Sequence, residues 1–318
     1  MKKKNVVVIG GGNGSAISLV ALKQNVDLFD ISAVIAMSDS GGSSGKLRKE
    51  FGTLPPGDVL RAILALSRYD YLLLKKIFNG NRFSANNKLS GHNLGNIFLT
   101  LTEQYAGDFN MAIRALEESV EAMGRVYPVT LANCDLVAEL NNKKIIRTEA
   151  AIDKPNYSRD LRIKKVWLDP QVKANKEAIS AILSADYIVL SPGSLYTSVV
   201  ATLLPNGIKE AIKKSNAKMV FVVGNAYHTD GETGPEYLSE TVKELEMYLP
   251  RPADWILYNI HKLTNKELAF YKTRNWGTIK YDPKNLPKRS IVAFDFSRTG
   301  GGLCSIKLGK KLKEILKS

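Results

Sequence analysis

Four short apolar runs in this chain are each followed at once by a loop rich in glycine, serine and asparagine. The runs cover residues 5–9, 33–37, 186–190 and 219–223, and the loops cover residues 10–15, 38–45, 191–198 and 224–234. Short runs of this kind, bounded by small residues, are typical of buried parallel strands. Because ligands bind beyond the carboxyl ends of parallel strands, we expect the four loops to meet in one cleft.

Helical patterns follow these loops, so the chain repeats a unit of strand, loop and helix. We expect helices over residues 16–23 and 175–183 and from about residue 199, which predicts a Rossmann-like three-layer α/β/α fold with a mostly parallel sheet. Residues 1–318 are expected to form one domain, with a helical insertion at about 59–123 and a small antiparallel β insertion at about 125–170. The first loop only nearly meets the dinucleotide pattern G-x-G-x-x-G, because Ser15 holds the third glycine position.

The loop at residues 38–45 is the strongest candidate for the chemistry. Its small residues expose backbone N–H groups that can hold phosphate oxygens, and Asp39 can bind a metal or a sugar hydroxyl. The alternative is a tight turn between strand and helix that binds nothing. The loop is not an ATPase P-loop, because Ser40 stands where the first glycine is required and Leu47 stands where Ser or Thr is required.

A second polar cluster lies at residues 90–96. His92, Asn93 and Asn96 stand beside two glycines, just before an apolar helical run, and can supply hydrogen bonds to a ligand. The alternative is that His92 and Asn93 cap the helix. Upstream, Asp58 is expected to cap a helix over residues 59–76.

The formal net charge of +14 fits nucleic-acid binding, a site for anionic small molecules or a lysine-rich solvated surface. The lysines favour the solvated surface over nucleic acid, since they are scattered in pairs at 75–76, 143–144, 164–165, 213–214 and 310–311. No arrangement of Ser, His and Asp and no zinc spacing stands out.

Membrane and redox features point to the cytoplasm. No apolar run approaches the roughly 20 residues that span a bilayer, and the apolar residues 6–9 are too few for a signal peptide. The two cysteines, Cys134 and Cys304, form no framework and suit a reducing compartment. The oligomeric state is open, and a homo-oligomer is one expectation.

Several motifs, taken in order, resemble one family. They cover residues 10–14, 38–47, 52–58, 91–96, 124–130 and 192–198. The chain is similar to the family shared by YvcK, called gluconeogenesis factor, and CofD, the 2-phospho-L-lactate transferase, and is more similar to the YvcK branch. The resemblance implies a protein that binds a nucleotide or nucleotide sugar such as UDP-N-acetylglucosamine. It also implies links to carbon metabolism, cell shape and cell-wall precursor supply.

The resemblance and the loops together predict a set of ligand-binding residues and no catalytic residue. Lys46 or Arg48 is expected to add positive charge for a phosphate. The predicted ligand-binding residues are Gly11, Gly12, Asn13, Gly14, Ser38, Asp39, Ser40, Gly41, Gly42, Ser43, Ser44, Gly45, Lys46, Pro56, Gly57, Asp58, His92, Asn93, Asn96, Pro192, Gly193, Ser194, Tyr196, Thr197 and Asn225.

The transferase branch implies a second hypothesis, a Mg²⁺-dependent transferase that acts on a nucleotide-diphosphate-linked substrate, with Asp39 as metal ligand. The family usually has two adjacent acids there, and Ser40 replaces the second. One carboxylate is a poorer Mg²⁺ site than two, because this ion prefers several oxygen ligands. Two other positions depart from the family: Asn13 stands where Thr is common, and Cys304 and Ser305 stand where a His-Asp pair is common.

Overall fold

Seven strands form a central sheet in which all neighbours are parallel. The computed structural model describes residues 2–80, 82–84, 89–224, 226–286 and 290–317. The strands are β1 (Lys4–Gly10), β2 (Phe29–Ile35), β3 (Gly124–Pro128), β7 (Tyr187–Leu190), β8 (Lys218–Val222), β10 (Trp255–Asn259) and β12 (Ser290–Phe294), in the spatial order β12–β10–β8–β7–β1–β2–β3. The central strands β1 and β7 are almost wholly buried, which explains their unbroken apolar sequences.

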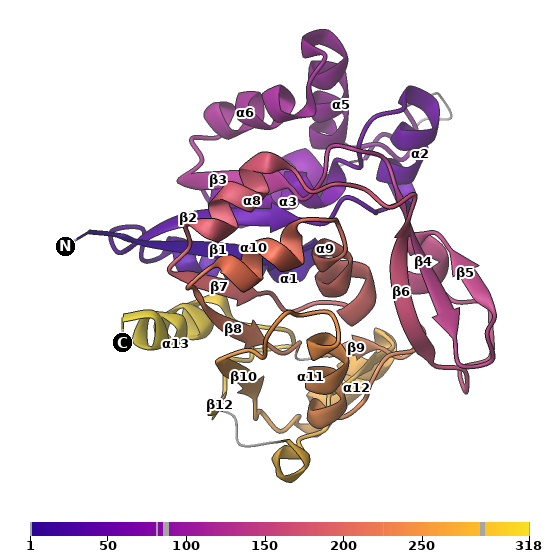
Figure 1. Ribbon diagram of the computed structural model, residues 1–318, viewed down its shortest axis with the longest axis vertical. Helices are drawn as coiled ribbons and strands as arrows, with labels where there is room; N and C mark the ends of the chain where they lie inside the picture. The colour runs from indigo at the N-terminus through magenta and orange to yellow at the C-terminus, as the bar shows by residue number, and fades with distance from the viewer. Residues whose placement is uncertain (1, 81, 85–88, 225, 287–289, 318) are drawn as a thin grey trace.

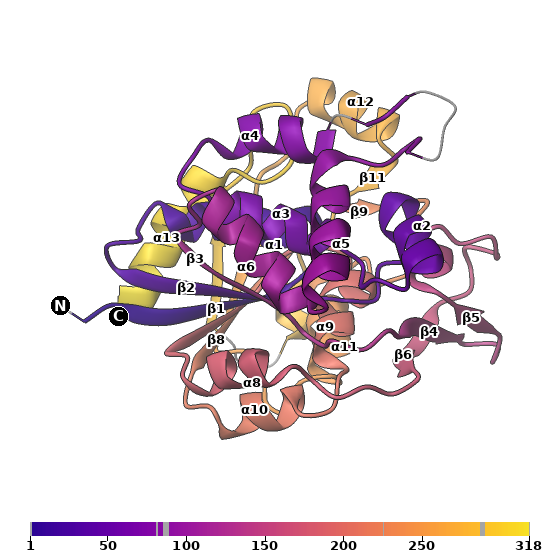
Figure 2. The same ribbon diagram turned by 90° about the horizontal axis from the view of Figure 1, so that it is seen from above.

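Helices cover both faces of this sheet (Figure 1, Figure 2). On one face lie α1 (Gly12–Lys23), α3 (Gly57–Leu66) and α13 (Ser305–Lys317). On the other lie α8 (Lys176–Leu183), η2 (Leu195–Val200), α9 (Ala201–Leu203), α10 (Ile208–Lys214) and α11 (Leu238–Glu246). The predicted three-layer Rossmann-like fold with a mostly parallel sheet is therefore confirmed.

Further elements extend from the layers. The N-terminal half adds α2 (Gly42–Phe51), α4 (Tyr71–Leu74), η1 (Lys75–Gly80), α5 (Leu94–Ala106) and α6 (Phe109–Ser119). A small antiparallel sheet of β4 (Asp135–Leu140), β5 (Ile145–Arg147) and β6 (Ile163–Asp169) carries α7 (Glu149–Asp153). The C-terminal half adds β9 (Tyr227–His228) paired with β11 (Trp276–Gly277), α12 (Asn265–Thr273) and η3 (Pro283–Asn285). Among the described residues, no helix combines the length and apolar character needed to cross a membrane.

Three local predictions were wrong. The helix expected over residues 59–76 ends at Leu66, and Asp70 caps a separate helix by accepting a hydrogen bond from the Leu73 N–H. Asp58 lies inside α3, so it does not cap it. The first part of the expected β insertion is β3, which pairs with β2 at the edge of the main sheet.

The edge strand β3 is protected by a buried carboxylate. Glu117, which is 2% exposed, accepts a hydrogen bond from the Val126 N–H at 2.6 Å and binds Arg114 at 2.6 Å and Arg125 at 2.9 Å. Pro128 offers no N–H further along the same strand. The outer edge of β3 is therefore a poor template for another strand.

Candidate functional site

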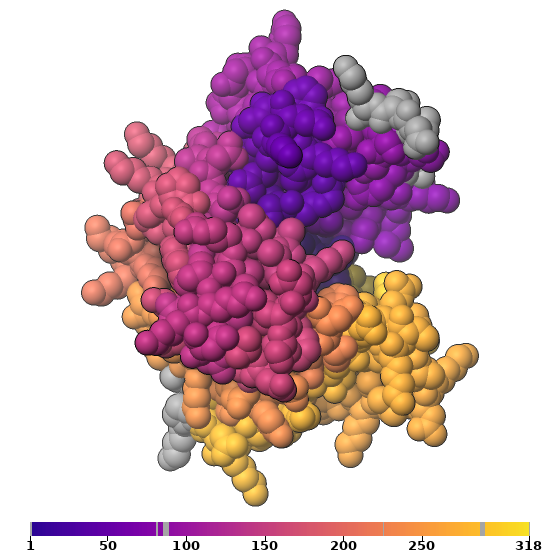
Figure 3. Space-filling view, turned by 90° about the vertical axis from the view of Figure 1, so that its right-hand side faces the viewer, coloured from indigo at the N-terminus to yellow at the C-terminus, as the bar shows by residue number. Residues whose placement is uncertain are grey.

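The loops after β1, β2, β7 and β8 line a cleft of about 470 Å³ at the carboxyl edge of the sheet. The strand order reverses between β1 and β7, so the cleft lies at the switch point where open parallel sheets bind ligands. Figure 3 shows this hollow between the indigo-to-purple and the orange-to-yellow parts of the chain. The predicted residues that line it are Gly11, Gly12, Asn13, Gly14, Asp39, Asp58, Pro192, Gly193, Ser194 and Thr197.

The other predicted residues do not line the cleft. They are Ser38, Ser40, Gly41, Gly42, Ser43, Ser44, Gly45, Lys46, Pro56, Gly57, His92, Asn93, Asn96 and Tyr196, while Asn225 lies outside the described residues. The reason for many of them is that α2 begins at Gly42, so half of the expected loop is helical. Within it, Ser43 Oγ lies 2.9 Å from His92 Nδ1 and accepts a hydrogen bond from the Asn96 amide at 3.0 Å. This buried network ties α2 to α5.

Several polar residues serve the fold. The side chain of Asn93 accepts a hydrogen bond from the Asn96 N–H and caps α5, as the capping alternative predicted. The Lys46 ammonium points to the carbonyl oxygen of Ser90 at 3.4 Å. Arg48 donates to the carbonyl oxygen of Cys134 at 2.9 Å, which joins α2 to the loop before β4. Neither of these two cations lines the cleft.

The N-terminus of α1 opens directly into the cleft. Gly11 precedes the helix without a side-chain cap, and Gly12 donates its N–H to Asp58 Oδ2 at 2.8 Å. In the described part of the chain, no acceptor is found for the N–H groups of Asn13 and Gly14, which belong to the first turn. Gly14 must be glycine, since a Cβ there would lie 1.5 Å from the carbonyl oxygen of Pro192.

Three cations gather beside this helix end. Arg61 lines the cleft and pairs with Asp58. Lys75 donates a hydrogen bond to the Asn13 side chain at 3.1 Å. Burial, followed by the positive charges of Arg61 and Arg298, lowers the pKa of Lys75. Arg61 and Arg298 therefore lie near enough to Lys75 for their positive charges to disfavour its charged form.

Carboxylates from the β2 loop and α7 also line the cleft. Burial, and after it the negative charges of Asp39 and Asp153, raises the pKa of Glu149 to about 8. Burial also raises the pKa of Asp39, with Asp58 as the next cause, and burial is the main cause of the raised pKa of Asp153. Clustered carboxylates in a cleft are typical of functional sites, because folding alone gains nothing from their repulsion.

Glu232 occupies the start of η2. Its carboxylate accepts hydrogen bonds from the N–H groups of Tyr196 at 3.2 Å and Thr197 at 3.0 Å. Burial raises the pKa of Glu232 to about 7, although these N–H groups oppose the rise. The loop at 191–198 therefore already holds a carboxyl group that belongs to the protein, and part of its predicted phosphate-binding capacity is in use.

A third wall is aromatic. Tyr227 and His228 on β9 and Trp276 on β11 line the cleft together with Ile279. The Trp276 ring is held edge-on by Tyr271, with ring centroids 5.3 Å apart. A rigid wall of this kind can stack against a planar group such as a nucleobase.

The described residues do not form a ready cation site. Asp39 Oδ1 accepts a hydrogen bond from the Gly41 N–H at 2.9 Å. In the part of the chain that the structure describes, no three His, Cys, Asp or Glu side chains are grouped so as to hold a metal ion. Mg²⁺ would therefore find few protein ligands at Asp39, and its role as a metal ligand stays a prediction.

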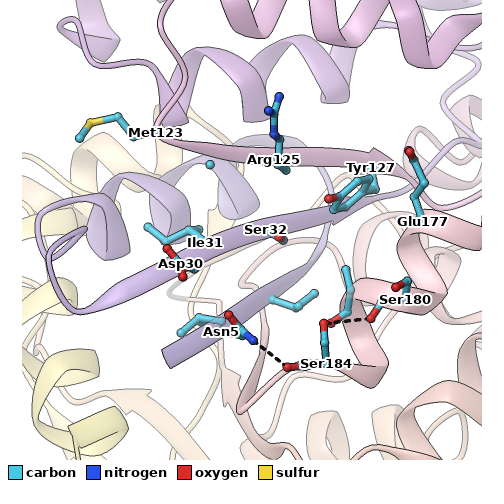
Figure 4. A pocket seen from close by; sticks show the side chains of 14 residues that line it. Asn5, Asp30, Ile31, Ser32, Met123, Arg125, Tyr127, Glu177, Ser180 and Ser184 are labelled. Carbon is cyan, nitrogen blue, oxygen red and sulfur yellow. Dashed lines mark hydrogen bonds between the residues drawn. The ribbon is translucent and has the colours of Figure 1, made fainter. Parts of the chain in front are cut away.

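A second hollow of about 460 Å³ lies at the amino ends of β1, β2 and β3, beside α8 (Figure 4). Some of its polar groups bind one another: the Asn5 amide donates to the carbonyl oxygen of Ser184, and the Ser184 hydroxyl donates to that of Ser180. It has no open helix N-terminus, since α8 begins with the capping side chain of Asn175. The switch-point cleft is therefore the better candidate.

Sequence reasoning missed most of the charged lining of the cleft. The missed residues that line the cleft are Arg61, Glu149, Asp153, Tyr227, Glu232 and Trp276. Lys75, which contacts Asn13 beside the cleft, was also missed. A signal existed for Arg61, which follows Asp58 by one helical turn. No comparable signal existed for the acids of α7, because only the packing of the antiparallel sheet brings them to the cleft.

Comparisons with known proteins agree on one family. The family described as 2-phospho-L-lactate transferase CofD matches residues 6–295. The gluconeogenesis factor of Halalkalibacterium halodurans is 41% identical over 242 residues, covering 75% of this chain and 73% of that protein. The gluconeogenesis factor of Bacillus subtilis is 33% identical over 287 residues, covering 90% of this chain and 88% of that protein.

A solved structure has the same fold. The crystal structure of a UPF0052 family protein from Bacillus halodurans superposes with a TM-score of 0.90 at 33% sequence identity. The superposition covers 98% of this chain and 99% of the other. The resemblance predicted from the motifs is therefore confirmed at the level of the family.

Proposed function

This chain belongs to the CofD family and to its gluconeogenesis factors, and from that premise we propose that its cleft binds a nucleotide sugar of the UDP-N-acetylglucosamine type. The cleft has three different walls, and a nucleotide sugar has three different parts. The helix end with its cations suits the diphosphate, the aromatic wall suits the base, and the carboxylate wall suits sugar hydroxyls.

One observation supports the proposal most strongly. The N–H groups of Asn13 and Gly14 have no acceptor among the described residues, and they face the cleft beside Arg61 and Lys75. An open helix N-terminus with nearby cations is a standard way to hold phosphate oxygens, because the helix dipole and the N–H groups act together. The identity of the base rests on the family resemblance.

We propose a regulatory and not a catalytic role, in the cytoplasm, with links to carbon metabolism, cell shape and cell-wall precursor supply. These assignments rest on the family resemblance. The transferase alternative requires a cation to assist the transfer of a phosphorus-containing group, and the described acids around Asp39 are not grouped to hold one. We therefore derive no reaction step for this chain.

Titration calorimetry with UDP-N-acetylglucosamine tests the proposal. We expect saturable one-site binding with a dissociation constant below about 1 mM, which corresponds to at least about 4 kcal/mol of binding free energy. Absence of heat up to millimolar ligand, from protein whose circular dichroism shows it to be folded, would contradict the proposal. Release of free nucleotide in the presence of Mg²⁺ would instead favour the transferase alternative.

A further inference from the structure

The carboxylate wall is held in place by bonds between two segments far apart in the sequence. The Ser40 N–H donates to Glu149 Oε2 at 3.4 Å, and the Ser40 hydroxyl oxygen accepts a hydrogen bond from the Ala150 N–H at 3.0 Å. These reciprocal bonds fix the start of α7 against the loop after β2. The antiparallel sheet that carries α7 thus supplies one side of the cleft.

Asp153 stands one helical turn after Glu149 and lines the same cleft. In the described part of the chain, no hydrogen bond or ion pair of its carboxylate is found. Burial is the main cause of its raised pKa, so the group is partly withdrawn from water without a partner. A carboxylate in this state gains by accepting hydrogen bonds from hydroxyl groups of a ligand.

The carboxylates that line the cleft differ in whether a cation is paired with them. Five carboxylates line it, those of Asp39, Asp58, Glu149, Asp153 and Glu232. In the described ranges, only Asp58 forms an ion pair, with Arg61 next to the open end of α1. The charge of Asp58 is therefore offset by Arg61, whereas no paired cation is found for Asp153 on α7 among the described residues.

We propose that Asp153 makes the cleft select an uncharged, hydroxyl-bearing sugar and reject a sugar that carries a carboxylate. This inference rests on the proposed function and adds the class of sugar. An uncharged sugar satisfies the unpartnered carboxylate of Asp153, whereas a uronate would add a further negative charge to a partly desolvated wall.

Two ligands that differ at one carbon test the inference. UDP-N-acetylglucosamine and its uronate, in which the C6 hydroxymethyl group is a carboxylate, are titrated into the protein by calorimetry. We expect the uronate to bind at least about tenfold more weakly to the wild-type protein, a difference typical of one like-charge contact at a partly buried site. The replacement Asp153→Asn removes a charge but keeps the shape, and it should narrow the difference to about threefold or less.

The matched control is Asp160→Asn, because Asp160 is an exposed acid on the same antiparallel insertion and outside the cleft. This control should keep the full difference between the two ligands. Equal affinity of the two ligands for the wild-type protein would overturn the inference and leave the proposed function standing, even if Asp153→Asn fails to fold. An undiminished difference in folded Asp153→Asn would also overturn it. Failure of UDP-N-acetylglucosamine itself to bind would overturn the proposed function.

Discussion

The replacement Glu149→Gln should stabilise the unliganded protein in alkaline solution and have little effect in mild acid. In the folded protein the pKa of Glu149 is raised from 4.5 to about 8, with burial as the main cause. Between these values the folded state keeps a proton that the unfolded state has released. Stability therefore falls as the pH rises from about 4.5 to 8, and Gln, which mimics the protonated acid, removes that loss.

The magnitude follows from the two pKa values. A pKa raised from 4.5 to about 8 corresponds to about 5 kcal/mol if the whole difference acts on folding. Glu149 is partly exposed at the cleft surface, and screening by water reduces the effect to about 2 kcal/mol. Glu149→Gln should therefore exceed the wild-type free energy of unfolding by about 2 kcal/mol at pH 8.5, and by less than about 0.5 kcal/mol at pH 5.

Urea denaturation of both proteins at pH 5 and pH 8.5 measures this difference. The amide oxygen of Gln can still accept the hydrogen bond from the Ser40 N–H, so geometry changes little. Glu118→Gln is the matched control, because the Glu118 side chain is 79% exposed. A Glu149→Gln effect that is the same at both pH values, or that is destabilising at pH 8.5, would refute the explanation by burial and neighbouring acids.

Three further changes test other parts of the molecule. Lys75→Ala should weaken UDP-N-acetylglucosamine binding about tenfold in calorimetry, while Lys76→Ala should not; equal effects would argue against a phosphate beside α1. Glu117→Ala should lower the free energy of unfolding in urea by about 3–5 kcal/mol, since two arginines and a buried N–H lose their partner; a loss below about 1 kcal/mol would contradict that account. Gly14→Ala should lower the thermal midpoint and abolish ligand binding, because its methyl group would overlap the carbonyl oxygen of Pro192; near wild-type binding would exclude the close contact.

The sheet and the position of the cleft were predictable because both follow from local pattern. Apolar runs such as residues 5–9 and 186–190 need cover on both faces, and that requirement specifies a parallel sheet flanked by helices. The residues at which loops end and helices begin were less predictable. Ser43 was expected in a ligand loop but belongs to α2, where His92 and Asn96, which lie 49 and 53 residues later, satisfy its hydroxyl inside the protein.

The positively charged residues of the cleft were also hard to predict from the sequence. Lys46 and Arg48 follow the glycine-rich loop in sequence and were natural candidates for a phosphate site. Arg48 instead joins α2 to the loop before β4, while Arg61 and Lys75, on later helices, reach the open end of α1. Proximity in sequence is a weak guide to a cleft whose walls come from separate segments, since the packing of α2 against its neighbours decides where its side chains bind.

Glu232 shows that a predicted anion-binding position can be occupied by a side chain of the protein itself. A loop of small residues before a helix predicts an anion at the backbone N–H groups, and the structure places an anion at Tyr196 and Thr197. That anion is the protein's own carboxylate, supplied from 35 residues beyond Thr197. The same physical rule therefore has two outcomes in one cleft. Glu232 takes the N–H groups of both Tyr196 and Thr197 at the start of η2, whereas at the start of α1 Asp58 takes only the Gly12 N–H, and among the described residues no acceptor is found for the N–H groups of Asn13 and Gly14. A ligand with its phosphates on one side only matches such a cleft, whereas a ligand with a second anionic group would have to displace Glu232.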